Sequence, residues 1–227
     1  MQNVEKNLAE IHARIANAAK AAGRDPDSVL LLAVSKKKPA SDIREAYRCG
    51  QIDFGENYLQ EALQKMQELD DLDICWHFIG AIQSNKTRSI AEAFDWVHCI
   101  ERIKIAQRLS DQRPTTLAPL NVCIQINLDD EASKAGIDLS DLPELARAVS
   151  TLPGIRLRGL MTIPAPREDF DEQRRAFSRM GEALQLLRDQ GIECDTLSMG
   201  MTQDMEAAIA EGSTLVRIGT AIFGERQ

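Results

Sequence analysis

The chain has 227 residues, of which 44% are hydrophobic and 27% are charged, and its formal net charge is −8 at pH 7. This is the composition of a soluble globular protein with a sizeable core, and its acidity argues against the basic face that nucleic-acid-binding proteins present to phosphate. The first 23 residues carry both signs of charge without an unbroken apolar run, so we expect neither a signal peptide nor a membrane anchor.

The first expected elements follow from the spacing of apolar residues. Four apolar residues recur at helical spacing in the opening segment, namely Val4, Leu8, Ile11 and Ile15. The apolar run over residues 29–36 is too short for a buried helix and predicts a strand covered on both faces. We expect Ser41 or Asp42 to cap a helix over residues 43–49.

The same alternation continues to the end of the chain. Further strands are expected at 52–57, 74–80, 95–100, 121–128, 157–163, 195–200 and 215–221. The segments between them have helical patterns, at 58–69, 86–93, 102–112, 142–152, 170–191 and 205–212. Strict alternation of strands and helices predicts parallel strands with helical crossovers. About eight such units in a chain of this length indicate an α/β fold, a single (β/α)8 TIM barrel domain spanning residues 1–227.

The cysteines are scattered along the chain. They are Cys49, Cys75, Cys99, Cys123 and Cys194. No two form a CxxC pair, and several lie in apolar runs, which is typical of reduced thiols in a cytoplasmic protein. The spacing therefore predicts neither a disulfide framework nor a metal site.

Unusual residues gather at the expected carboxyl ends of the strands, where TIM barrels place their active sites. They are Ser35, Lys36, Gly55, Glu56, Asn57, His77, Gly80, Met161, Thr162, Ser198, Met199, Gly200, Met201, Arg217, Gly219 and Thr220. Residues from distant parts of the chain would thus converge on one face of the barrel. We expect the functional site there.

Lys36 is the strongest single candidate. It follows Leu32 and Val34 at the two-residue period of a strand, so it points to the same side as they do. If that side is the barrel interior, desolvation leaves more of the amine unprotonated, as condensation with a carbonyl compound requires. The alternative is a lysine that extends from the strand end into water.

Two glycine-containing segments predict a phosphate site. Residues 198–202 enter a helix and residues 217–220 leave the last strand, which is where barrels often bind phosphate through backbone N–H groups. Glycines allow close approach of an anion, although glycines are also common at such turns. Together with Lys36, these segments predict a phosphorylated carbonyl compound as the ligand.

The motifs AVSKKKP, FGENYLQE, WHFIGAIQSNK, LRGLMTIP and LSMGMTQDMEAAIAEGSTLVRIGTAIFG together resemble the YggS/PROSC-type pyridoxal phosphate homeostasis proteins. The resemblance spans residues 29–224 and rests on a specific combination of motifs. It implies a barrel like the N-terminal domain of alanine racemase (fold type III), without the C-terminal β domain of the racemases. It also implies pyridoxal 5′-phosphate (PLP) as the cofactor.

The resemblance assigns roles to individual residues. Lys36 matches the lysine that holds PLP as a Schiff base, and Arg217 matches the arginine facing the pyridine nitrogen. The remaining cofactor-binding positions are Ser198, Gly219 and Thr220 in the phosphate cup, Asn57 lining the cofactor, and His77 and Met199 nearby. Thr202 stands where serine is frequent in the family, which keeps a hydroxyl. His77 can equally be a core histidine.

The implied function is binding of PLP in the intracellular homeostasis of vitamin B6, with effects on amino-acid and keto-acid metabolism and no turnover reaction of its own. PLP-dependent apo-enzymes are the expected acceptors, and we expect a monomer or weak homodimer. Lys134, in the loop after the fifth strand, is either a second amine for PLP transfer or a solvated loop lysine.

Two enzymatic alternatives remain. One is a weak amino-acid racemase, which needs a second base besides the lysine; the two tyrosines, Tyr47 and Tyr58, are poor candidates for it. The other is a Schiff-base aldolase or synthase acting on a phosphorylated sugar, with Glu56 as its acid/base carboxylate. The family resemblance argues against this second alternative.

Overall fold

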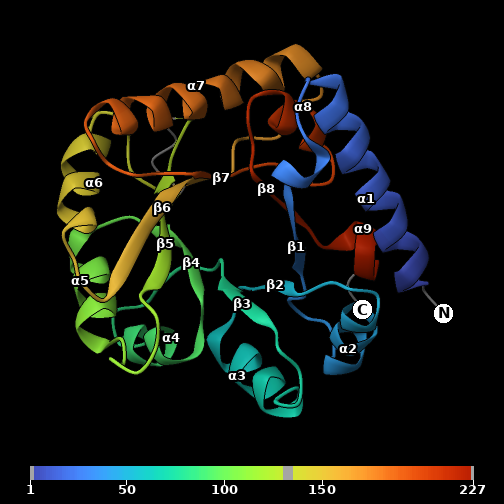
Figure 1. Ribbon diagram of the computed structural model, residues 1–227, viewed down its shortest axis with the longest axis horizontal. Coiled ribbons are helices and arrows are strands. Elements are labelled where there is room, and N and C mark those ends of the chain that lie inside the picture. Colours follow the sequence, from blue (N-terminus) through green and yellow to red (C-terminus); the bar gives the residue numbers. More distant parts are fainter. Residues whose placement is uncertain (1–2, 130–134, 226–227) are drawn as a thin grey trace.

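The computed structural model describes residues 3–129 and 135–225. Its eight strands are all parallel and close into a barrel in chain order, with β8 pairing back to β1 (Figure 1). The strands are β1 (Leu30–Val34), β2 (Asp53–Glu56), β3 (Cys75–Phe78), β4 (Trp96–Ile100), β5 (Leu120–Ile126), β6 (Ile155–Thr162), β7 (Thr196–Ser198) and β8 (Leu215–Ile218). The α/β TIM barrel predicted from the alternation is therefore confirmed.

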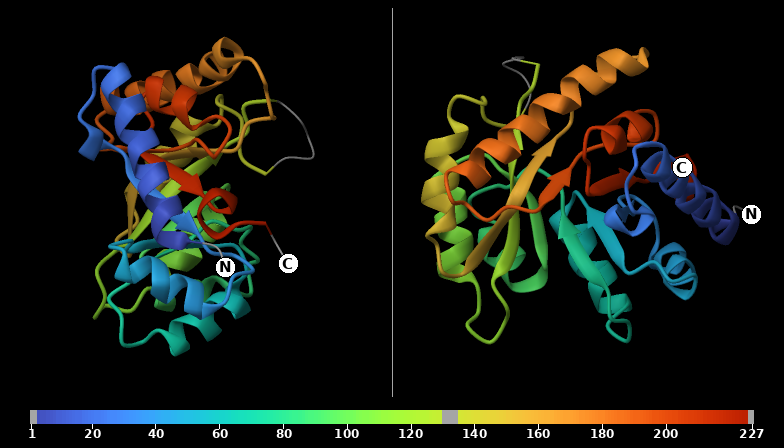
Figure 2. Two further views of the ribbon diagram at one scale, coloured as in Figure 1. Left: turned by 90° about the vertical axis from the view of Figure 1, so that its right-hand side faces the viewer. Right: turned by 45° about the horizontal axis from the view of Figure 1, so that its top comes forward.

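Helices cover the outside of the barrel (Figures 1 and 2). They are α1 (Val4–Ala21), α2 (Ala40–Arg48), α3 (Leu59–Glu68), α4 (Thr87–Ala93), α5 (Ile103–Gln112), α6 (Leu142–Ser150), α7 (Phe170–Asp189), α8 (Met205–Ala210) and α9 (Thr220–Phe223), with a 3-10 turn η1 at Pro26–Ser28. Helix α1 packs against both α8 and α9, so the two ends of the chain lie close together. None of the helices in the described ranges is both long and apolar enough to cross a membrane.

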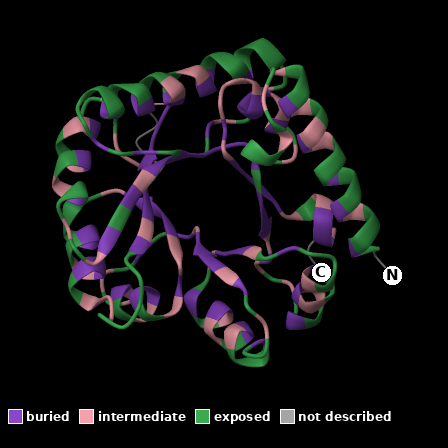
Figure 3. Cartoon of the chain, viewed as in Figure 1, coloured by how far each residue is buried: buried purple, intermediate pink, exposed green. Residues whose placement is uncertain are grey.

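The core has the two layers that a TIM barrel requires, one inside the strands and one between strands and helices. The apolar stripe predicted for the first helix is buried, each of its four residues being 3% exposed. Most strand residues are buried, while the outer faces of the helices are exposed (Figure 3). This explains the continuous apolar run of β1.

The predicted cap of the second helix is wrong. Helix α2 begins at Ala40, and neither Ser41 nor Asp42 caps it. Pro39 is its N-cap residue, with extended backbone at φ −70° and ψ 160° and no side-chain cap bond. Proline fixes φ near this value and cannot continue a strand ladder, so the chain turns into the helix earlier than a polar cap predicts.

Candidate functional site

A cavity of ≈ 190 Å³ lies at the carboxyl ends of the strands. Its lining residues come from both ends of the chain and from loops between them, namely Val34, Lys36, Lys38, Asn57, Ile79, Met161, Ile163, Met201, Thr202, Arg217, Gly219, Thr220 and Gly224. Lys36 and Arg217 meet here because β1 and β8 are hydrogen-bonded neighbours in the closed barrel. The cavity has the mixture of apolar walls and a few polar groups that is typical of cofactor sites.

The segment carrying Lys36 is held from below by a buried hydrogen-bond network. The Ser35 hydroxyl donates to Oε1 of Glu56 at 2.7 Å, and Nζ of Lys65 donates to the Ser35 carbonyl at 2.8 Å. Lys65 Nζ also lies 2.7 Å from Oε1 of Glu56 and 2.6 Å from Oε1 of Glu61. The side chains of Glu56 and Lys65 thus fix Ser35, the residue immediately before Lys36.

The residue after Lys36 is fixed as well. Lys37 has a left-handed backbone with φ 60°, which is uncommon for a residue with a side chain. Its N–H donates to Oε1 of Glu61 at 2.5 Å, and the N–H of Lys38 donates to the Ser35 carbonyl at 3.0 Å, closing a tight turn. The turn compensates the backbone cost and sets where Lys36 enters the cavity.

Lys38 belongs to the site, which the sequence did not predict. It lines the cavity, and its Nζ donates to the carbonyl of Glu225 at 2.9 Å. A run of three lysines at a strand end looks solvated, and only the turn at Lys37 brings Lys38 back over the cavity. Among the residues that the structure describes, the cavity wall therefore carries two primary amines, Lys36 and Lys38.

Glu56 is not at the cavity wall. Its side chain is fully buried beneath it, and burial raises the pKa of the carboxyl, partly offset by Lys65 and Ser35. The Oε2 atom has no hydrogen-bond partner among the described residues. Glu56 acts through Ser35 and Lys65 on the backbone of β1, and the structure gives no support to its role as an acid/base for an aldolase.

Asn57 lines the cavity with an unused acceptor. Its Oδ1 is buried and lacks a hydrogen-bond partner within the described part of the chain, while its Nδ2 makes one long contact of 3.5 Å to the Ile79 carbonyl. Buried polar atoms are rarely left without partners, and an exception points to a ligand or water. A Cβ atom at Gly80 would collide with the Asn57 carbonyl, so glycine is required at position 80 for Asn57 to take this place.

Arg217 is a buried cation at the base of the cavity. Its guanidinium donates to the Ser198 carbonyl at 2.6 Å, to the Ser198 hydroxyl at 2.8 Å and to the Thr162 carbonyl at 2.8 Å. Burial lowers the pKa of Arg217 to about 10, and Asp204 partly opposes this. The three acceptors fix the plane of the guanidinium while one edge faces the cavity.

Three predicted cofactor residues lie elsewhere. Ser198, Met199 and His77 are buried and do not line the cavity. The Ser198 hydroxyl bonds to Arg217 and to His98 in the barrel interior, so its placement does not support a phosphate contact. Thr202, four residues later, provides the hydroxyl residue of this loop at the cavity, because the chain leaves the strand after Ser198 and turns at Gly200 with φ +99°.

The contacts of His77 are those of a core histidine, since both of its ring nitrogens have hydrogen-bond partners. Its ring nitrogens contact Asp53 and His98, and Trp96 stacks on it with ring centroids 5.4 Å apart. The remaining predicted residues, Lys36, Asn57, Arg217, Gly219 and Thr220, come together as expected. Lys134 lies outside the described residues.

Comparisons with known proteins agree with this geometry. The family described as alanine racemase, N-terminal domain, matches residues 6–227. A pyridoxal phosphate homeostasis protein of Pseudomonas aeruginosa is 61% identical over 226 residues, covering 100% of this chain and 97% of the relative. A protein of the same name from Escherichia coli K12 is 54% identical over 229 residues, covering 100% and 98%.

The chain belongs to the pyridoxal phosphate homeostasis protein family. The present chain superposes on the PLP-bound structure of PipY, a COG0325 family member from Synechococcus elongatus, with a TM-score of 0.86 at 36% sequence identity. That match covers 98% of this chain and 100% of PipY. An alanine racemase from Corynebacterium glutamicum shares the fold at 21% identity with a TM-score of 0.66, and 60% of its chain is covered.

Proposed function

We propose that this protein binds PLP in the cavity at the carboxyl ends of its strands and serves in the intracellular homeostasis of the cofactor. The observation that carries the proposal is the joint placement of Lys36 and Arg217 on one cavity wall, beside the loops bearing Thr202, Gly219 and Thr220. The names of the relatives and the PLP-bound PipY structure support the same cofactor.

The residues fit this cofactor chemically. When bound, PLP supplies an aldehyde that condenses with a primary amine and a pyridine ring that withdraws electrons. Lys36 provides the amine, held in place by the turn at Lys37 and by the network beneath Ser35. Thr202, Gly219 and Thr220 provide hydroxyl and backbone groups for the phosphate, and the unused Oδ1 of Asn57 accepts a hydrogen bond from the ligand.

Arg217 favours holding the cofactor over carbanion chemistry. Its guanidinium is a cation fixed by three carbonyl and hydroxyl oxygens, and a cation beside the pyridine nitrogen disfavours protonation of that nitrogen. An unprotonated ring stabilises a neighbouring carbanion less. The site is thus suited to storage and transfer of PLP, with PLP-dependent apo-enzymes as acceptors.

A racemase fits the site less well. Racemisation requires a base on each face of the substrate α-carbon, and a tyrosine is the expected partner of the lysine. Neither of the two tyrosines lines the cavity; Tyr47 packs against the core and Tyr58 is 51% exposed. We therefore propose that the protein is a carrier without turnover. Its free cysteines agree with a cytoplasmic location. We also propose that it is a monomer or weak homodimer.

The test is the absorption spectrum of the purified protein with PLP, followed by borohydride reduction and peptide mapping. We expect the reduced adduct on Lys36 and its loss in Lys36→Ala, while Lys104→Ala, at an exposed position on α5, binds as the parent protein does. An adduct on Lys38 would mean that PLP binds in the same cavity but forms its Schiff base with Lys38. An adduct spread over surface lysines, or none, would refute the proposal. Racemisation assays on the loaded protein then test for turnover.

A further inference from the structure

A chain of buried hydrogen bonds runs from Arg217 through the barrel interior to the opposite mouth. The Ser198 hydroxyl lies 2.8 Å from Nδ1 of His98, and Nε2 of His98 lies 2.9 Å from Nδ1 of His77. Nε2 of His77 lies 3.0 Å from Oδ1 of Asp53. Both imidazoles are fully buried, so each of their ring nitrogens is expected to have a hydrogen-bond partner.

When Asp53 is a carboxylate, every hydrogen bond in this series has a defined donor and acceptor. A carboxylate only accepts, so His77 carries its proton on Nε2 and accepts at Nδ1. His98 then carries its proton on Nε2 and accepts at Nδ1 from the Ser198 hydroxyl, which in turn accepts from Arg217. Burial lowers the pKa of both histidines, which agrees with a neutral pair.

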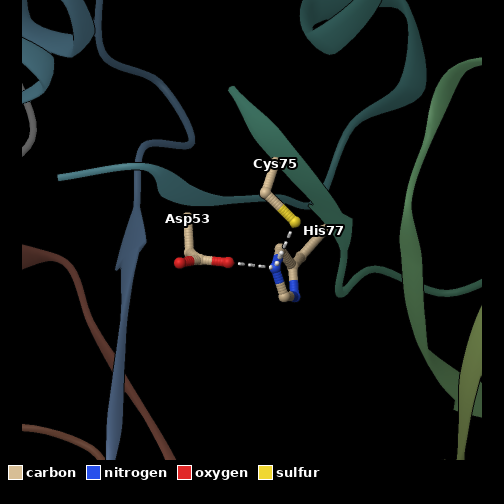
Figure 4. A group of neighbouring side chains, drawn as sticks. All are labelled: Asp53, Cys75 and His77. Carbon is tan, nitrogen blue, oxygen red and sulfur yellow. Dashed lines mark hydrogen bonds and ion pairs between the residues drawn. The ribbon is translucent and has the colours of Figure 1, made fainter. Parts of the chain in front are cut away.

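Three chemically different metal ligands meet at the far end of this chain. Asp53 and Cys75 are the first residues of β2 and β3 and are register partners, and His77 is the next residue on the same face of β3. Figure 4 shows the three side chains pointing toward one another. Nε2 of His77 lies 3.0 Å from the Asp53 oxygen and 3.4 Å from the Cys75 sulfur, and all three ligand atoms lie within 4.8 Å of one another.

These separations suit a zinc ion. Bond lengths of about 2.0–2.3 Å in a tetrahedron place neighbouring ligand atoms roughly 3.3–3.6 Å apart. The two distances from Nε2 of His77 need to change by only a few tenths of an ångström, and the Asp53 oxygen and the Cys75 sulfur, within 4.8 Å of each other, need to close by at most about 1.3 Å. A set of one imidazole, one thiolate and one carboxylate is typical of Zn²⁺ and leaves a fourth position for water. The carboxylate of Asp95, whose Oδ2 accepts from the Trp76 N–H, adds negative charge nearby.

The surroundings provide access and orientation. The Asp53 side chain is 22% exposed and Cys75 is partly exposed, so an ion can reach the group from the amino-terminal mouth of the barrel. Trp96 stacks on His77 at an interplanar angle of 6°, and Nδ1 of His77 contacts His98. A metal-ligating histidine is commonly held in this way through its other nitrogen.

We propose that Asp53, Cys75 and His77 form a zinc-binding site at the amino-terminal mouth of the barrel, linked through His98 and Ser198 to Arg217. Zinc takes the lone pair of Nε2 of His77, which moves the ring proton to Nδ1. His77 then donates to Nε2 of His98, and His98 donates from Nδ1 to Ser198. The thiol proton of Cys75 leaves to solvent, and the histidines and Ser198 keep their total number of protons. The direction of donation through the two histidines is thus reversed, and the Ser198 oxygen then accepts from both His98 and Arg217.

The site is tested without the cofactor, so its outcome is independent of the function proposed above. Zn²⁺ is titrated calorimetrically into the chelator-treated full-length protein, and Co²⁺ serves as a spectroscopic probe. We expect one equivalent of tight binding and a thiolate-to-cobalt charge-transfer band, both lost in Cys75→Ser. Cys49→Ser, at an exposed thiol, and Cys194→Ser, at a buried one, are the matched controls and should bind as the parent protein does.

A second variant distinguishes loss of the zinc site from loss of the fold. Asp53→Asn changes a partly exposed side chain and should also abolish stoichiometric binding, with the unfolding midpoint of each variant recorded alongside. Absence of one-equivalent binding, or binding that survives Cys75→Ser, would overturn the site.

The link has its own readouts. ¹⁵N spectra of the histidines should show the proton of His98 moving from Nε2 to Nδ1 on addition of zinc, and His98→Asn should weaken zinc binding by about 10–100-fold. Zinc binding that leaves the His98 spectrum unchanged would overturn the link to Ser198 and Arg217.

Discussion

The guanidinium of Arg217 donates to both the carbonyl and the hydroxyl of Ser198, at 2.6 and 2.8 Å. This pair joins the cavity at one mouth of the barrel to the histidines in its interior. Ser198 therefore positions the guanidinium of Arg217, and its hydroxyl faces the barrel interior rather than the cavity.

Replacement of Ser198 by alanine should destabilise the fold. The change removes one acceptor from Arg217 and leaves Nδ1 of His98 without a partner, and an unsatisfied buried polar atom costs about 1–3 kcal/mol. Denaturant unfolding measures the loss. Ser178→Ala, at a half-buried position of α7 where the hydroxyl donates to the Arg175 carbonyl of the same helix, is the control and should have little effect. Equal losses in the two variants would argue against a special role for Ser198.

Unfolding stability should depend on pH through His98. Its folded pKa is lowered by burial first and then by His77 and Arg217. The unfolded chain therefore takes up a proton as the pH falls below about 6.5 while the folded protein does not. The stability this histidine provides is complete above that pH and is lost below it, by up to about 1.4 kcal/mol per pH unit.

The comparison with His98→Asn isolates this effect. The difference in unfolding free energy between the parent protein and the variant should shrink as the pH is lowered from 7 to 5. A difference that is independent of pH would mean that His98 is protonated equally in both states.

Lys65→Met should be strongly destabilising. The lysine is buried between two carboxylates, and its loss leaves Glu56 buried without a cation. Breaking a buried pair in this way costs about 3–5 kcal/mol. The Ser35 carbonyl also loses one of its two donors and keeps only the Lys38 N–H, so the position of Lys36 should loosen and PLP binding should weaken. Removal of the exposed Arg44–Asp71 pair by Asp71→Ala is the control, and little change in the unfolding midpoint is expected there.

Gly80→Ala should weaken PLP binding more than it harms folding. The added methyl group collides with the Asn57 carbonyl, so the backbone must shift and Asn57 loses its place at the cavity. Gly181→Ala, within α7, meets only the Glu211 carbonyl at 3.7 Å and replaces a poor helix former, so it should be neutral or stabilising. Spectroscopic titration with PLP measures both variants, and equal affinities would exclude Asn57 from the cofactor site.

The barrel and much of the cavity can be predicted from the sequence. Strand and helix periods are local properties, and eight alternations leave few topologies other than a closed barrel. The two-residue period also placed Lys36 on the same side as Leu32 and Val34. In the structure Leu32 is fully buried, and Val34 and Lys36 line the cavity.

Which polar groups contact one another depends on the folded barrel and cannot be predicted from the sequence. Ser198 and Thr202 are neighbours in sequence, but the turn at Gly200 sends one into the interior and the other to the cavity. Asp53 meets Cys75 and His77 because β2 and β3 pair in one register, which no spacing along the chain encodes, so the scattered cysteines gave no metal signal. Side-chain contacts across a barrel depend on register and strand stagger, and these are set by packing of the whole core.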